Sequence, residues 1–219
     1  MDTLQINQSS YFQDTSLLRV CDNLNIGIFG GSFNPPHQGH MYIAEQAIKY
    51  LHLNLLIWLV APQNPLKKEN QAFLPLKERL RLSKALTKYN FKIKVTAIEE
   101  SFNSSYTYNT LAKIRSMISP NSNLIWIMGE DNLKQFHLFR QWQNIIKNYN
   151  LAVFARNGVS FSTLLKKSHI VYKSKQLNYF DKQLLNNKTT NLKFYLISKN
   201  GLSSTQIREN LKKPIITNI

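Results

Sequence analysis

The sequence contains few cysteines, glycines and acidic residues, and each shortage restricts what the protein can be. Cys21 is the only cysteine among 219 residues. A single thiol without a CxxC or CxxH neighbour excludes an intramolecular disulfide and a cysteine-based metal site, which is typical of a reducing compartment. The longest apolar run, Leu55–Ala61, is far shorter than the roughly 20 residues of a membrane-spanning helix. Residues 1–20 also lack a basic start and an apolar stretch, so we expect a cytoplasmic protein without a membrane partner.

Acidic residues are the second shortage. The chain has 12 Asp and Glu residues against 28 Lys and Arg residues, so its net charge is +16 and its isoelectric point is about 9.9. Such a charge attracts nucleic acid, an anionic membrane surface or a phosphate-rich small substrate. The basic residues are mostly Lys scattered among Asn and Ile, which favours a solvated basic surface. The charge therefore does not choose among these partners.

Short apolar runs alternate with amphipathic stretches along most of the chain. Strands are expected at 26–29, 55–60, 93–95, 124–128, 151–155 and 194–197, and helices around the apolar positions of 43–51, at about 76–88 and at about 109–118. This alternation is typical of an α/β protein with a doubly wound parallel sheet, a Rossmann-like fold. Residues 1–23 are expected to be an extension of uncertain order, and residues 24–219 a single domain. Between 160 and 193 the sequence predicts only a weak strand at 170–172.

Four of the seven glycines lie in the first strand or the loop after it, namely Gly27, Gly30, Gly31 and Gly39. A Gly-Gly pair at the end of a strand allows backbone N–H groups to approach phosphate oxygens, and the next helix adds its positive N-terminus. Doubly wound sheets bind nucleotides at this place. For Gly27, close packing within the strand is an alternative explanation.

His37 and His40 are separated by nearly one helical turn, so both imidazoles are expected on the same side of a helix entrance. Two donors would then face one phosphate chain. An ordinary hydrogen-bonded histidine and an HxxH zinc site are the alternatives. Zinc catalysis usually needs a third Cys, Asp, Glu or His ligand, and none stands nearby at a standard spacing, so no metal ligands are predicted.

The segment Ile28–Pro35, followed by His37 and Gly39-His40, resembles the signature loop of the nucleotidyltransferase α/β-phosphodiesterase superfamily. Within it the chain resembles the bacterial nicotinate-nucleotide adenylyltransferases. The match is specific because it combines Gly-Gly, an aromatic residue, a turn with Pro, and the HxGH pair in a fixed order. The resemblance implies ATP contacts from Gly30, Gly31, Ser32, Phe33, His37 and His40.

A second match lies near the C-terminus, where Leu202–Arg208 resembles the superfamily's ISSTxxR element with Leu for the first Ile. Hydroxyls at a helix N-terminus cap backbone groups or bind phosphate, and an arginine one turn later offers a planar fork. Taken alone, a helix cap and a surface arginine explain this segment. Together with the first loop, the resemblance implies ATP contacts from Ser203, Ser204, Thr205 and Arg208. It also implies catalytic roles for His37, His40 and Arg208, with Mg²⁺ held mainly by the substrate phosphates.

Further matches concern the two nucleotides. The letters GEDNL at 129–133 resemble the family's GxDxL element, which implies that Gly129 and Asp131 bind ATP. Tyr106 and Thr107 lie in a match to the family's SYTxxTL stretch, and Trp142 matches a tryptophan that stacks on the pyridine ring. A capped helix start and ordinary core packing are the alternatives for these residues.

The mononucleotide is also implied to contact Asn64, Lys67 and Arg156. Relatives often carry a Pro-Pro-His-Lys-type loop at the first two positions and Arg-Pro-Gly at the third, whereas this chain has Pro-Gln-Asn-Pro-Leu-Lys and Arg-Asn-Gly. Gln143 stands where relatives often have Tyr. The resemblance as a whole implies transfer of AMP from ATP to nicotinate mononucleotide, giving nicotinate adenine dinucleotide and pyrophosphate in NAD biosynthesis.

Other functions stay open on the sequence alone. Adenylyltransferases acting on nicotinamide mononucleotide or phosphopantetheine, and cytidylyltransferases, would share the first loop; chain length and the later matches argue against the last two classes. A nucleic-acid-binding protein would suit the charge of +16, but the sequence has no RNP-like or helix-turn-helix signature. We therefore expect ATP and nicotinate mononucleotide as ligands, and no nucleic-acid partner.

Overall fold

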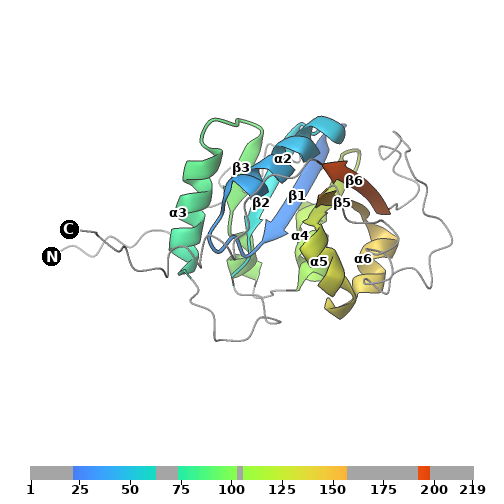
Figure 1. Cartoon of the computed structure of the whole chain (residues 1–219). Coiled ribbons are helices and arrows are strands. Elements are labelled where there is room, and N and C mark those ends of the chain that lie inside the picture. Colours follow the sequence, from blue (N-terminus) through green and yellow to red (C-terminus); the bar gives the residue numbers. More distant parts are fainter. Residues whose placement is uncertain (1–21, 63–73, 103–105, 157–191, 198–219) are drawn as a thin grey trace, which may run out of the picture.

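Six parallel strands form one sheet in the computed structural model, which describes residues 22–62, 74–102, 106–156 and 192–197 (Figure 1). The strand order is β3-β2-β1-β4-β5-β6. The bounds of the strands are β1 (Asn25–Gly31), β2 (Leu55–Val60), β3 (Ile93–Thr96), β4 (Asn123–Gly129), β5 (Asn150–Arg156) and β6 (Leu192–Ile197). Every neighbouring pair in this order is parallel.

Helices cover both faces of the sheet (Figure 1). One face packs against α2 (Gln38–Tyr50) and α3 (Leu76–Thr87). The other face packs against α4 (Thr107–Met117), α5 (Glu130–Gln135) and α6 (Trp142–Asn148), together with the 3-10 helices η2 (Ile98–Phe102) and η3 (Phe136–Leu138). None of the described helices has both the length and the apolar character needed to cross a membrane.

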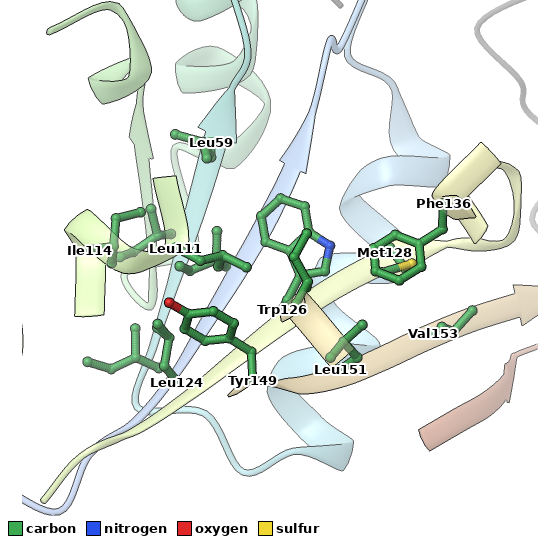
Figure 2. Packing of buried hydrophobic residues seen from close by; sticks show 14 of the residues in the cluster. Leu59, Leu111, Ile114, Leu124, Trp126, Met128, Phe136, Tyr149, Leu151 and Val153 are labelled. Carbon is green, nitrogen blue, oxygen red and sulfur yellow. The ribbon is translucent and has the colours of Figure 1, made fainter. Parts of the chain in front are cut away.

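Successive side chains of the central strands enter two separate cores. In β1, Ile26 and Ile28 join the core under α4 to α6, whereas Phe29 joins the core under α2 and α3. Figure 2 shows the first of these cores, in which the labelled aromatic side chains are Trp126, Phe136 and Tyr149. Because both faces of the sheet are covered, β1 and β4 each bury five consecutive residues and read as continuous apolar runs.

The α/β class and the doubly wound parallel sheet are confirmed, and all strands and helices predicted within the described residues are present. The structure adds η2, α5, η3 and α6, which the sequence did not predict. Helices α5 and α6 have six and seven residues, too few to display a helical repeat of apolar positions. The weak strand at 170–172 and most of the extension 1–23 lie outside the described residues. The single-domain boundary at residue 24 stays a prediction.

The order of the strands reverses at β1. The chain runs from β1 through β2 to β3 on one side, and then crosses to β4, β5 and β6 on the other. β1 and β4 are parallel neighbours with Phe29 opposite Ile127, so their carboxyl ends at Gly31 and Gly129 lie side by side. Ligands of doubly wound sheets bind in the crevice outside these ends, at the reversal point.

Trp126 explains why position 30 is a glycine. A Cβ added at Gly30 would lie 3.1 and 3.2 Å from Cζ3 and Cζ2 of the Trp126 indole, and closer still to Cη2. The indole is only 4% exposed, so it has little room to shift. At Gly31 an added Cβ would meet the Phe33 ring at 3.3 Å. The glycine pair therefore accommodates two aromatic rings, in addition to any contact that its N–H groups make.

We expect Gly30→Ala to lower the free energy of unfolding by about 1–3 kcal/mol, because the new methyl group overpacks a buried ring. Gly129→Ala is the control, since its Cβ would meet Ile43 at an ordinary 3.8 Å. The control should cost under about 1 kcal/mol, the size of a change at a helix cap. Urea unfolding of both variants measures the difference. Equal losses would show that Trp126 does not dictate the glycine.

Candidate active site

Helix α2 begins at a cap formed by two histidines. His37 is the N-cap residue, and its Nδ1 accepts a hydrogen bond from the Gly39 N–H at 3.0 Å. His40 stands at the third helical position, and its Nδ1 accepts from the His37 N–H at 3.3 Å. This is a capping box in which imidazoles take the places of the usual hydroxyl and carboxylate groups. The two imidazoles thus hold the start of α2 reciprocally.

The cap determines which nitrogen of each ring carries the proton. A neutral imidazole has one N–H and one acceptor nitrogen, so a ring that accepts at Nδ1 carries its hydrogen on Nε2. The rings of His37 and His40 lie together as their spacing predicted, with centroids 3.8 Å apart and planes inclined by 33°. Two Nε2–H donors therefore come from adjacent rings at a helix N-terminus, which itself favours an anion. This arrangement suits a chain of phosphate groups.

An aromatic cluster supports the loop between β1 and α2. Phe33 packs on Trp58 with centroids 4.4 Å apart, and its ring lies edge-on to His40 at 5.0 Å. Phe29 adjoins both Phe33 and Trp58 at 5.4 Å. The backbone of Phe33 has φ of 44°, a region that most side chains avoid. Because Phe33 is 2% exposed, its side chain belongs to the core, and the predicted contact of Phe33 with ATP stays a prediction.

The turn from β4 into α5 forms the other side of the reversal point. Gly129 is the last residue of β4 and the N-cap of α5, so it lies where the GEDNL match predicted. Asp131 stands in the first turn of α5, where a negative charge is favoured. Its side chain is 82% exposed and pairs with Lys134 at 2.9 Å, a surface pair that contributes little to stability. The Asp131 carboxylate is therefore accessible at the carboxyl edge of the sheet.

Tyr106 and Thr107 lie at the start of helix α4. Tyr106 is the N-cap residue and Thr107 the first helical residue, so a helix does start here, although Tyr106 makes no side-chain capping hydrogen bond. The guanidinium of Arg140 lies over the Tyr106 ring, 4.8 Å from its centroid. This cation–π contact joins the start of α4 to the turn before α6, and it brings a positive charge that the sequence did not single out.

Glu99 ties the same helix to the sheet. It lies in η2 directly after β3, is 5% exposed, and accepts a hydrogen bond from the Thr110 hydroxyl at 2.7 Å. Burial raises the pKa of the Glu99 carboxyl, and the bond from Thr110 opposes that shift only in part. The Thr110 N–H in turn donates to the Tyr106 carbonyl at 3.1 Å. The buried pair thus fixes the first turn of α4.

Trp142 opens α6 and is partly buried against the core under α4 to α6. Its ring meets Phe136 with centroids 6.3 Å apart and planes inclined by 70°. Core packing therefore accounts for one side of the indole. The stacking of a pyridine ring on Trp142 stays a prediction. The next residue, Gln143, is exposed.

The remaining predicted site residues lie at or beyond the described ranges. Arg156 ends β5 at the carboxyl edge of the sheet. Outside the described residues are Asn64, Lys67, Ser203, Ser204, Thr205 and Arg208. Their contacts, and the pairing of the first loop with the C-terminal motif, stay predictions. Within the described ranges, no group of three or more His, Cys, Asp or Glu side chains could hold a metal ion.

Two residues near the site were not predicted from the sequence. Arg79 is 2% exposed, and its guanidinium donates to backbone carbonyls that include that of Ser32. Asn34 accepts a hydrogen bond at Oδ1 from the Leu74 N–H at 2.9 Å. The sequence did carry a signal for Arg79, because this charge shares the core-facing side of α3 with Leu80.

Known proteins match this chain over most of its length. The profile of the cytidylyltransferase-like family matches residues 28–210. A Rhizobium johnstonii protein named a probable nicotinate-nucleotide adenylyltransferase is 43% identical over 184 residues, which are 84% of this chain and 91% of the relative. The chain belongs to the nicotinate-nucleotide adenylyltransferase family. A Brucella abortus protein of the same name is 43% identical over 155 residues, 71% of this chain and 78% of the relative.

Membership of the nicotinate-nucleotide adenylyltransferases confirms the nucleotidyltransferase predicted from the Gly30–His40 loop. Among solved structures, a Plasmodium falciparum nicotinic acid mononucleotide adenylyltransferase complexed with APC matches with a TM-score of 0.62 at 17% identity. The same enzyme complexed with NaAD matches with a TM-score of 0.61. Each match covers 88% of this chain and 86% of the other. At this identity the likeness establishes the fold.

The buried Glu99 makes a prediction about pH. Its pKa in the folded state lies above the unfolded value near 4.5, so the stability it contributes is complete below that value and is lost as pH rises through the folded pKa. Glu99→Gln keeps an acceptor for Thr110 without the titration. We therefore expect the melting temperature of Glu99→Gln, relative to wild type, to rise as pH increases from about 4.5.

Thermal unfolding across this pH range, monitored by circular dichroism, measures the effect. Glu100→Gln is the matched control, because Glu100 is the next residue and is exposed. Its melting temperature should follow that of wild type at every pH. A constant difference between Glu99→Gln and wild type would contradict the raised pKa of Glu99.

Proposed function

We propose that the protein transfers the adenylyl group of ATP to nicotinate mononucleotide, giving nicotinate adenine dinucleotide and pyrophosphate. The observation that supports this proposal is the double-histidine cap of α2, whose two imidazoles would offer Nε2–H donors after β1, the strand at which the order reverses. The relatives from Rhizobium johnstonii and Brucella abortus carry the name of this activity. The net charge of +16 is compatible with substrates that carry several phosphates, although it does not select them.

The reaction needs no nucleophilic side chain. A phosphate oxygen of the mononucleotide attacks the α-phosphorus of ATP in line, and the bond from that phosphorus to the pyrophosphate oxygen breaks. Negative charge builds up on the oxygens around the α-phosphorus and on the leaving pyrophosphate. His40 would donate from Nε2 to the α-phosphate, and His37 from its adjacent ring to the neighbouring phosphate. The protein thus contributes alignment and positively polarised donors.

Magnesium is proposed as a companion of ATP. The described part of the site offers imidazole N–H donors, which suit phosphate oxygens, and the single exposed carboxylate of Asp131. This donor set fits an ion whose ligands are mainly phosphate oxygens and water. When bound, the ion would neutralise charge on the phosphates.

The acceptor site is proposed on the other side of the reversal point. The start of α4, with Tyr106 and Thr107, offers helix N–H groups for a carboxylate, and Trp142 offers an indole for the pyridine ring. Asn64, Lys67 and Arg156 are proposed to complete this side. Ser203, Ser204, Thr205 and Arg208 are proposed to hold the ATP phosphates opposite His37. We further propose a cytoplasmic enzyme that needs no nucleic-acid or membrane partner.

Purified protein incubated with ATP and Mg²⁺ should convert nicotinate mononucleotide to its dinucleotide, with pyrophosphate released in equal amount. Nicotinamide mononucleotide and phosphopantetheine, assayed in parallel, test the alternative acceptors and should react more slowly. His40→Ala, purified in the same way, is the control for contaminating enzyme. Losing this donor should lower kcat roughly 10²–10³-fold while ATP binding is kept. No turnover with any of the three acceptors would refute the proposal.

A further inference from the structure

One buried guanidinium connects three separate backbone segments beside the site. Arg79 donates from Nη1 to the carbonyls of Ser32 at 2.6 Å and Ala61 at 2.7 Å. Its Nη2 donates to the Pro62 carbonyl, and its Nε donates to the Leu74 carbonyl at 3.0 Å. All four acceptors are backbone oxygens, and burial lowers the pKa of the guanidinium. A buried charge satisfied in this way is costly to replace, because its partners depend on its shape.

The three segments are the proposed ATP loop and the two ends of the connection that carries the proposed acceptor residues Asn64 and Lys67. Ser32 follows β1 and begins the proposed ATP loop, whereas Ala61 and Pro62 follow β2. Leu74 leads into α3, and its N–H donates to Asn34 of the same ATP loop at 2.9 Å. Arg79 therefore holds the loop after β1 against both ends of the connection from β2 to α3.

We propose that Arg79 is a positioning residue, which holds the proposed ATP loop against the two described ends of the β2–α3 connection, at Ala61–Pro62 and Leu74, and so aligns the acceptor with the α-phosphorus. This inference rests on the proposed function. Adenylyl transfer depends on in-line alignment, and a displacement of about 1 Å can cost on the order of 100-fold in rate. Lysine preserves the charge at this position, but a single ammonium lacks the planar fork that reaches carbonyls on three segments.

Arg79→Lys tests the proposal, and Arg115→Lys is its matched control. Arg115 is also a guanidinium held by backbone carbonyls, since it donates to Ser122 at 2.6 Å and to Ser119. Burial lowers its pKa as well. These carbonyls, however, lie just before β4, at the opposite edge of the sheet from the proposed site. Comparing the two variants separates the loss of a guanidinium bound to backbone carbonyls from the loss of alignment.

The measurements are thermal unfolding, the dissociation constant of ATP, and kcat and KM with nicotinate mononucleotide. We expect both variants to unfold at lower temperature. Only Arg79→Lys should lower kcat about 10-fold or more, with ATP affinity changed by less than about threefold, because the four bonds of Arg79 go to carbonyls outside the histidine cap. A kcat for Arg79→Lys within about twofold of wild type, or an equal loss in Arg115→Lys, would overturn the proposal.

A second variant covers the case in which Arg79→Lys does not fold. Asn34→Ala removes the side-chain acceptor that ties the loop after β1 to the Leu74 N–H, so it should lower kcat in the same sense and more than Arg115→Lys does. A normal kcat in Asn34→Ala would count against the proposal. An inactive wild type would instead refute the proposed function, so the two failures are distinguishable.

Discussion

The reciprocal cap between His37 and His40 is the interaction on which the site depends. It ends the loop after β1, starts α2 and assigns an acceptor role to Nδ1 of both rings. A capping box usually serves stability alone. Here the same two hydrogen bonds also orient the groups that would contact phosphate, because the tautomer of each ring follows from them. The same local arrangement therefore stabilises the helix and orients the proposed phosphate donors.

The sheet holds this cap through aromatic packing and buried charge. Trp58 and Phe33 support His40 on one face of β1, and Trp126 occupies the space beside Gly30 on the other. Arg79 and Glu99 then tie the surrounding segments to the frame with bonds that are shielded from water. Removing one partner of a buried charged bond typically costs more than removing a neutral one. The loops at the carboxyl edge are accordingly held by a few strong contacts.

The sequence was informative where the physical signal is local. Continuous apolar runs such as 124–128 predicted buried parallel strands, and the spacing of His37 and His40 predicted adjacent rings. Signals that depend on tertiary structure were missed. The reason for Gly30 lies in Trp126, almost a hundred residues away, and the partners of Arg79 come from three segments.

Short helices and family motifs also limit what the sequence can predict. Helix α6 is too short for a periodic pattern, so Trp142 could be placed from its family match but not on a helix. The ring of Phe33 is a comparable case. Its position in the motif indicated a contact with ATP, whereas its burial assigns the side chain to the core. A motif identifies which residues matter, and only packing shows which atoms face the ligand.

The tautomers of His37 and His40 test the central claim most directly. Long-range proton–nitrogen correlation spectra of ¹⁵N-labelled protein near neutral pH distinguish a protonated from an unprotonated nitrogen in each imidazole. Single His37→Gln and His40→Gln variants would assign the two rings among the five histidines of the chain. Both rings should show an unprotonated Nδ1 and a protonated Nε2. A proton on Nδ1 of either ring in the neutral state would contradict the cap, and with it the donor arrangement on which the proposed transfer depends.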